Sequence, residues 1–250
     1  MIEVKGANIS ELKLMRGSPI EIEGMGMLHQ FTIGELESIG EKKYENWLQM
    51  LSIETDVLKN LLNIDEGQEF TTFDFIIANC LMGDGSFLED TIEALSFIFK
   101  KEVVFIEEKA CFVIGDRDDN NIISKENYEL FRMILRLTNS IDKKEDVVEN
   151  PSNAKAAEIL KKRKEARKKL KEAKANQGNS DPLTWGDLVS ILCANGNGIT
   201  LENVWNMSVY SFNKQFVRMQ MLEEYDISIR SLLAGAKKED IELKHWMSAI

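Results

Sequence analysis

The clearest pattern of hydrophobic and polar positions lies in the C-terminal residues 183–250. Apolar side chains recur there every three or four positions, which is the spacing that places them on one face of a helix. The apolar positions are Leu188, Ile191 and Leu192 in a first segment, and Val209, Phe212, Phe216, Val217, Met219 and Leu222 in a second. Thr184 with Asp187 fits an N-terminal cap, and Gly235 fits a left-handed C-terminal residue. The pattern predicts a helical hairpin with a long second arm.

The N-terminal half mixes two periodicities. Short apolar runs broken by Gly and Pro, with alternation at Ile20 and Ile22, predict two or three short strands in residues 1–37. A helix is expected from near Gly34, and Gly40 would bend or divide it. Further helical patterns cover residues 55–64, 73–81, 87–99 and 124–139, the third opened by Ser86 and Glu89 as a capping box.

Residues 103–114 carry β-branched and aromatic side chains on both sides of a polar Glu-Glu-Lys turn, which predicts a central β-hairpin. The fold class is therefore α+β and predominantly α-helical. It has a small N-terminal strand region, the central hairpin and the C-terminal helical hairpin.

Composition changes sharply between residues 154 and 175, where ten basic and three acidic residues give a net charge of +7. Ala, Leu, Lys, Glu and Arg favour a helix here, and only a thin apolar strip remains, so we expect it to be largely solvated. We predict three parts on this basis: a mixed α+β N-terminal domain at 1–150, a basic helical linker at 151–182 and a C-terminal helical subdomain at 183–250.

The whole chain carries −11 at pH 7, with a sequence pI near 4.9, so the part outside the basic helix carries −18. Phosphate contacts need a positive surface, and an acidic protein more often meets other proteins. Nucleic acid could still bind the basic helix. Alternatively, the helix could dock on an acidic partner or on this chain's own acidic surface, or it could serve as a solvated spacer. Its candidate contact residues are Lys161, Lys162, Arg163, Lys164, Arg167, Lys168 and Lys169.

Catalytic and metal signatures are weak. Two isolated histidines, His29 and His245, do not form a triad or an HExxH motif. Residues 116–121 begin like a calcium loop, but Asn121 takes the place of the usual Gly and Asn127 that of the closing Glu. We predict no enzyme activity, no metal and no cofactor.

The three cysteines, Cys80, Cys111 and Cys193, lie far apart in apolar runs and are expected to be buried, reduced thiols. No N-terminal leader and no apolar run long enough to cross a bilayer is visible, so we expect no membrane association.

Three stretches resemble one protein family. They read LKLMRGSPIEI followed by QFTIGELESIGEKKYENWLQML, then FVIGDRDDNNIISKENYELFRMILRLTN, and finally ITLENVWNMSVYSFNKQFVRMQMLEEYDISIRSLLAG. The chain is similar over most of its length to tail assembly chaperones of tailed phages and prophages of Gram-positive bacteria. The resemblance implies a non-enzymatic protein that keeps the tape-measure protein soluble and recruits tail tube subunits in the host cytoplasm, and is absent from the mature virion.

An apolar-striped client chain calls for helical grooves on its helper. The candidate contact residues are Trp205, Tyr210, Phe212, Phe216 and Met219, with Trp185 and Trp246 as supports. The alternative is that these aromatic residues form the C-terminal core. Two other functions stay open: a structural tail or baseplate component retained in the virion, and a nucleic-acid-associated accessory protein. Self-association through the C-terminal hairpin is also possible.

Overall fold

The structure is a computed structural model that describes residues 2–4, 7–65, 67–83, 85–116, 121–141, 183–195, 198–235 and 245–248. Residues 1–141 and 189–250 form one compact unit, and residues 142–188 form another. The predicted domain boundaries at 150 and 182 lie outside the described residues and stay predictions. The seven residues of the basic helix listed above lie outside them as well.

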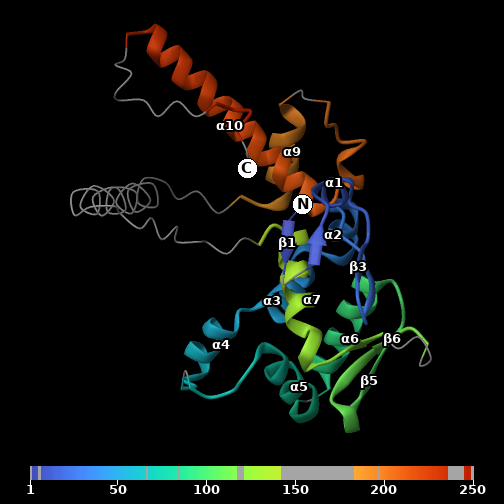
Figure 1. Cartoon of the computed structure of the whole chain (residues 1–250). Helices are drawn as coiled ribbons and strands as arrows, with labels where there is room; N and C mark the ends of the chain where they lie inside the picture. The colour runs from blue at the N-terminus through green and yellow to red at the C-terminus, as the bar shows by residue number, and fades with distance from the viewer. Residues whose placement is uncertain are drawn as a thin grey trace. The chain divides into compact units, whose positions relative to one another are not determined.

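The described elements are short strands and helices, and Figure 1 labels most of them. The first group is β1 (Ile2–Val4), β2 (Ala7–Ile9), α1 (Glu11–Arg16), β3 (Ile20–Ile22), β4 (Gly26–Leu28), α2 (Ile33–Ile39), α3 (Glu41–Ser52) and α4 (Thr55–Leu62). The second is α5 (Thr72–Met82), α6 (Ser86–Phe99), β5 (Val103–Ile106), η1 (Glu107–Lys109), β6 (Cys111–Ile114), β7 (Ile122–Ile123) and α7 (Lys125–Thr138). The third is α9 (Trp185–Ala194), η2 (Val204–Asn206) and α10 (Val209–Leu233).

All strand pairs among the described residues are antiparallel. β1 pairs with β2, β3 with β4, and β5 with β6, where Val103 faces Ile114 and Ile106 faces Cys111. The predicted central hairpin is confirmed, with η1 as its turn. β7 adds a third strand that the sequence did not reveal, because two residues are too short to show alternation. The α+β, mainly helical fold class is confirmed.

A helical layer forms the core beside these strands. α3 packs against α6 and α7, α5 packs against the same two helices, and α6 lies along β5 (Figure 1). Aromatic rings fill the contacts between these elements. The rings of Phe99 and Phe131 stack with their centroids 5.8 Å apart, and the ring centroids of Tyr128 and Phe73 are 5.2 Å apart. Stacked and tilted ring contacts of this kind add to the stability that apolar burial provides.

Two local predictions need correction. The helix α1 was missed: its six residues fall between β2 and β3, where strands alone were expected. Ser86 and Glu89 do not form the predicted capping box, because Gly85 is the N-cap residue at φ 91° and Ser86 is already helical. By contrast, Gly40 does divide the predicted helix, and it separates α2 from α3.

The C-terminal part is tied into the N-terminal part by backbone hydrogen bonds. Thr32 and Ser208 form an antiparallel bridge, in which the Ile33 amide donates to the Met207 carbonyl at 3.0 Å and the Val209 amide donates to the Phe31 carbonyl at 2.8 Å. The loop that follows η2 ends at this bridge, and α10 begins at the next residue. The first turns of α10 then pack on α1 and α7.

Candidate protein-binding surfaces

Most of the predicted contact residues on α10 lie inside the protein. Phe212 is fully buried, and Tyr210 and Met219 keep only 3% and 5% of their surface exposed. Phe216 is half-buried, and its ring stacks against Phe212 with centroids 6.4 Å apart. These side chains hold α10 on the core, so substituting them would disturb folding before it revealed binding.

Trp205 lies at the surface on η2, with 39% of its area exposed. Its indole Nε1 donates to the Leu201 carbonyl at 2.6 Å. Its backbone passes so close to Gly34 that a Cβ added there would lie 3.1 Å from the Trp205 carbonyl oxygen. The visible role of this residue is therefore to fix η2 on α2.

The other two tryptophans lie elsewhere. Trp185 is half-buried in the first turn of α9, next to the confirmed cap in which the Asp187 amide donates to the Thr184 hydroxyl. Trp246 belongs to residues 245–248, which are held on α10 by Arg218. The Arg218 guanidinium donates to the carbonyls of Trp246 and Ser248. The structure thus places Trp205 on η2 and Trp246 beside α10.

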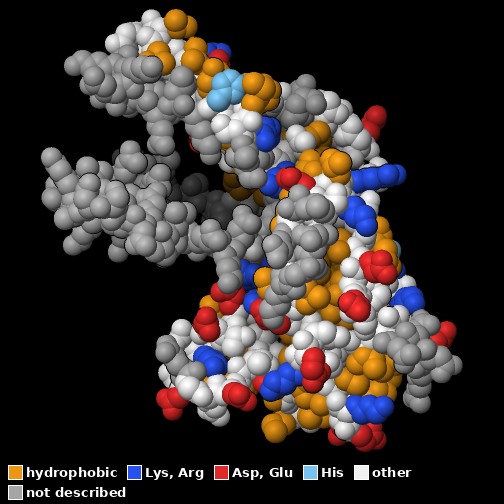
Figure 2. All heavy atoms as spheres, in the orientation of Figure 1, with side chains coloured by type: hydrophobic (Ala, Val, Ile, Leu, Met, Phe, Trp, Pro, Cys, Tyr) orange, Lys and Arg blue, Asp and Glu red, His pale blue; other side chains and the backbone are white. Residues whose placement is uncertain are grey.

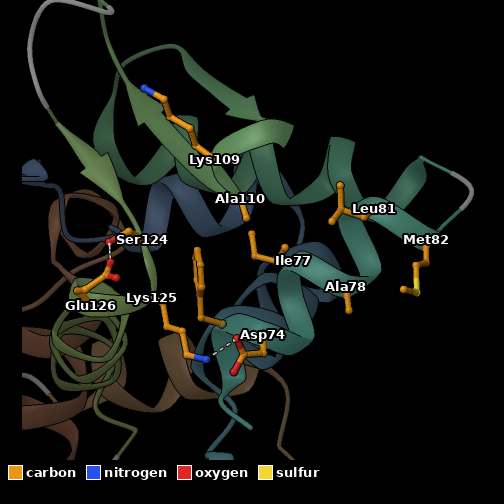
Figure 3. A pocket seen from close by; sticks show the side chains of 11 residues that line it. Asp74, Ile77, Ala78, Leu81, Met82, Lys109, Ala110, Ser124, Lys125 and Glu126 are labelled. Atoms are coloured by element: carbon orange, nitrogen blue, oxygen red, sulfur yellow. Dashed lines mark hydrogen bonds and ion pairs between the residues drawn. The ribbon is translucent and has the colours of Figure 1, made fainter. Parts of the chain in front are cut away.

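A hollow of about 410 Å³ opens between α5, the tip of the β5–β6 hairpin and the start of α7 (Figure 3). It is lined by Phe73, Asp74, Ile77, Ala78, Leu81, Met82, Lys109, Ala110, Ser124, Lys125 and Glu126. The lining is mainly apolar, and the side chains of Ile77 and Ala110 point toward each other in Figure 3. An apolar floor with a few polar groups is the usual make-up of a binding site.

Polar groups hold one end of this hollow in place. The Asp74 carboxylate caps α5 by accepting from the Thr71 amide at 2.8 Å, and it pairs with the Lys125 ammonium at 2.9 Å. Burial on its own would raise the pKa of Asp74, but hydrogen bonds from Lys125 and Thr71 outweigh it and lower the pKa. The bond from Asp74 raises the pKa of Lys125. Both groups stay charged at neutral pH, so this end of the hollow is fixed by an ion pair.

The other end is apolar and open to solvent. Leu81 and Met82, in the last turn of α5, expose 44% and 87% of their surface. A groove whose floor is apolar and whose rim carries charge of both signs suits the apolar face of an amphipathic helix. The sequence held a signal for this hollow, because apolar side chains lie on all sides of α5 and exceed what packing on one side requires. These side chains are Phe73, Phe75, Ile77, Leu81 and Met82.

No group of three or more His, Cys, Asp or Glu side chains among the described residues is placed to hold a metal ion. Residues 117–120 of the calcium-like loop lie outside the described part. Cys80 and Cys111 are buried, as predicted, whereas Cys193 is half-buried. Burial raises the pKa of Cys80 to about 11, so this thiol stays protonated at neutral pH.

These features define a mainly helical α+β protein that has an apolar hollow and a long C-terminal helix. Residues 173–250 match the family model described as the YomV second domain, a family of Bacillus prophage type. The match supports a phage or prophage origin. No curated protein and no solved structure matches the chain significantly. In the part of the chain that the structure describes, no helix is long and apolar enough to span a membrane.

Proposed function

We propose that this protein is a phage tail assembly chaperone that binds the tape-measure protein, the tail tube protein or both in the host cytoplasm. It acts by binding, without enzymatic chemistry, and leaves before the virion is complete. The observation that carries the proposal is the match of residues 173–250 to a prophage-type domain family. The resemblance of the chain's sequence to tail assembly chaperones narrows it to tail morphogenesis.

The hollow supports a binding role of this kind. A tape-measure protein is a long helical chain with apolar stripes, which would aggregate before the tube encloses it. A helix laid across the hollow would place apolar side chains against Ile77 and Ala110, and beside the exposed Leu81 and Met82. The polar face of that helix would point to water, and the Asp74–Lys125 ion pair would lie at the other end of the hollow.

The test is co-expression of the full chain with the tape-measure protein of the same phage, followed by affinity capture. The double variant Leu81→Glu with Met82→Glu places two carboxylates at the open end of the hollow, where both residues are exposed in the free protein. We expect at least about tenfold less tape-measure protein in the captured complex and in the soluble fraction.

The matched control is Leu12→Glu on α1, because Leu12 is a helical leucine that is 80% exposed and does not line the hollow. We expect it to capture as much tape-measure protein as the wild type. Equal capture by the double variant would exclude the hollow as the binding surface. Failure of the wild-type chain to capture either tail protein would contradict the proposed function itself.

A further inference from the structure

The second half of α10 carries apolar side chains that the described residues leave uncovered. Met221 is the last buried residue of this helix. Beyond it, Leu222 and Leu233 expose 43% and 83% of their surface, and Ile229 is half-buried. Figure 2 shows hydrophobic side chains at this end of the helix. Within the described part of the chain, this end of α10 therefore keeps apolar side chains exposed.

Three of these side chains fall on one face, whereas Ile227, which is 63% exposed, lies on another. Leu222, Asp226, Ile229 and Leu233 are spaced by four, three and four residues, which aligns them along the helix. Residues 245–248 lie on a neighbouring face, where Arg218 binds their carbonyls and Tyr225 contacts the ring of His245 at 4.9 Å. The described C-terminal residues therefore do not fill the face that carries Leu222 and Leu233.

The two charged residues Asp226 and Arg230 carry opposite signs and lie at equal distances on either side of Ser228. Asp226 lies two residues before Ser228 and Arg230 lies two residues after it, with Ile227 and Ile229 between them. Within one chain Asp226 and Arg230 form an ion pair of 2.7 Å, and both side chains are more than half exposed. Reading the helix backward about Ser228 thus exchanges the two charges and the two isoleucines, and it brings Leu233 to within one residue of the position of Leu222.

We propose that α10 pairs in antiparallel fashion with α10 of a second copy of this chain, about a two-fold axis level with Ser228. The axis places Asp226 of each copy beside Arg230 of the other copy, so the interface contains this contact twice. It also brings Leu222 near the other copy's Leu233 and sets the two Ile229 side chains together. A two-fold interface must complement itself, and the opposite charges of Asp226 and Arg230 do so.

The charges select this arrangement over its alternatives. A parallel pair would place Asp226 beside Asp226 and Arg230 beside Arg230, which repel. Exposed ion pairs contribute little affinity, so the apolar contacts of Leu222, Ile229 and Leu233 drive association, whereas the charges set the direction. The pairing involves a short segment and buries little area, so we expect a weak, concentration-dependent dimer. It does not depend on the proposed chaperone function.

Sedimentation velocity of the full chain, at concentrations up to about 200 µM because the interface is small, tests the pairing. The wild type should dimerise. Asp226→Arg and Arg230→Asp should each weaken dimerisation by about tenfold, because each variant sets like charges against each other at both ends of the interface. Mixing the two variants in equal amounts should restore a dimer, because one copy then carries two arginines and the other two aspartates.

The mixture separates pairing from helix stability, since both variants lose the ion pair within the chain and only the pair between copies is regained. Glu224→Arg is the matched control: it makes the same charge change on the opposite, exposed side of α10 and should dimerise like the wild type. A monomeric wild type, a dimer that survives both single variants, a mixture that stays monomeric, or an equal loss with Glu224→Arg would each overturn the proposal.

Discussion

Three polar side chains of α7 satisfy the last carbonyls of α3. The Tyr128 hydroxyl donates to the Leu51 carbonyl at 2.8 Å, and Arg132 and Arg136 donate to the Ser52 carbonyl at 3.5 and 3.1 Å. The last carbonyls of a helix have no partner inside the helix, and leaving them buried and unbonded is costly. Burial raises the pKa of Tyr128, so its hydroxyl stays a neutral donor.

Tyr128→Phe tests this arrangement, because it removes the donor and leaves the Leu51 carbonyl buried. The free energy of unfolding should fall by about 1–2 kcal/mol in chemical denaturation. Tyr225→Phe, on a partly exposed residue of α10, is the control and should change stability by less than about 0.5 kcal/mol. If Tyr128→Phe is as stable as the wild type, the bond to Leu51 contributes nothing to stability.

At the scale of elements, the sequence predicted what local periodicity can show. The helices at residues 55–62, 72–82, 86–99 and 125–138 follow their apolar patterns closely. The short α1 and β7 were missed because six and two residues carry no clear period. The bridge from Thr32 to Ser208 was invisible for a different reason: it joins residues far apart in the chain, and no local pattern records such a contact.

Gly34→Val tests the docking of η2 on α2. A Cβ at this position would lie 3.1 Å from the Trp205 carbonyl oxygen and 3.4 Å from its Cβ, so a branched side chain must push η2 away. We expect a loss of about 1–3 kcal/mol in the free energy of unfolding. Amide hydrogen exchange should also speed up at Ile33 and Val209, whose hydrogen bonds form the bridge.

Gly67→Val is the control for that substitution. An added Cβ at Gly67 has no neighbour within 4 Å, so the side chain fits without displacing anything. Its stability and its exchange rates at Ile33 and Val209 should match those of the wild type. Unchanged exchange at these two amides in Gly34→Val would show that η2 does not depend on the close approach at Gly34.

For the whole molecule, the candidate site was predictable only in part. Helical periodicity marked the aromatic residues of α10, but it could not tell a contact surface from a core, and Phe212 and Met219 lie in the core. The hollow joins α5, η1 and the start of α7, whose closeness depends on the tertiary packing of the helical layer. The basic residues at 161–169 lie outside the described part, so their role stays a prediction.

We propose that this chain serves tail assembly as a transient binding partner. Quantitative mass spectrometry of tail assembly intermediates and of purified virions from the same phage tests it most directly. We predict that the chain is abundant in intermediates that contain the tape-measure protein and absent from finished particles. A fixed, stoichiometric amount in mature virions would contradict the claim and identify the chain as a structural tail component.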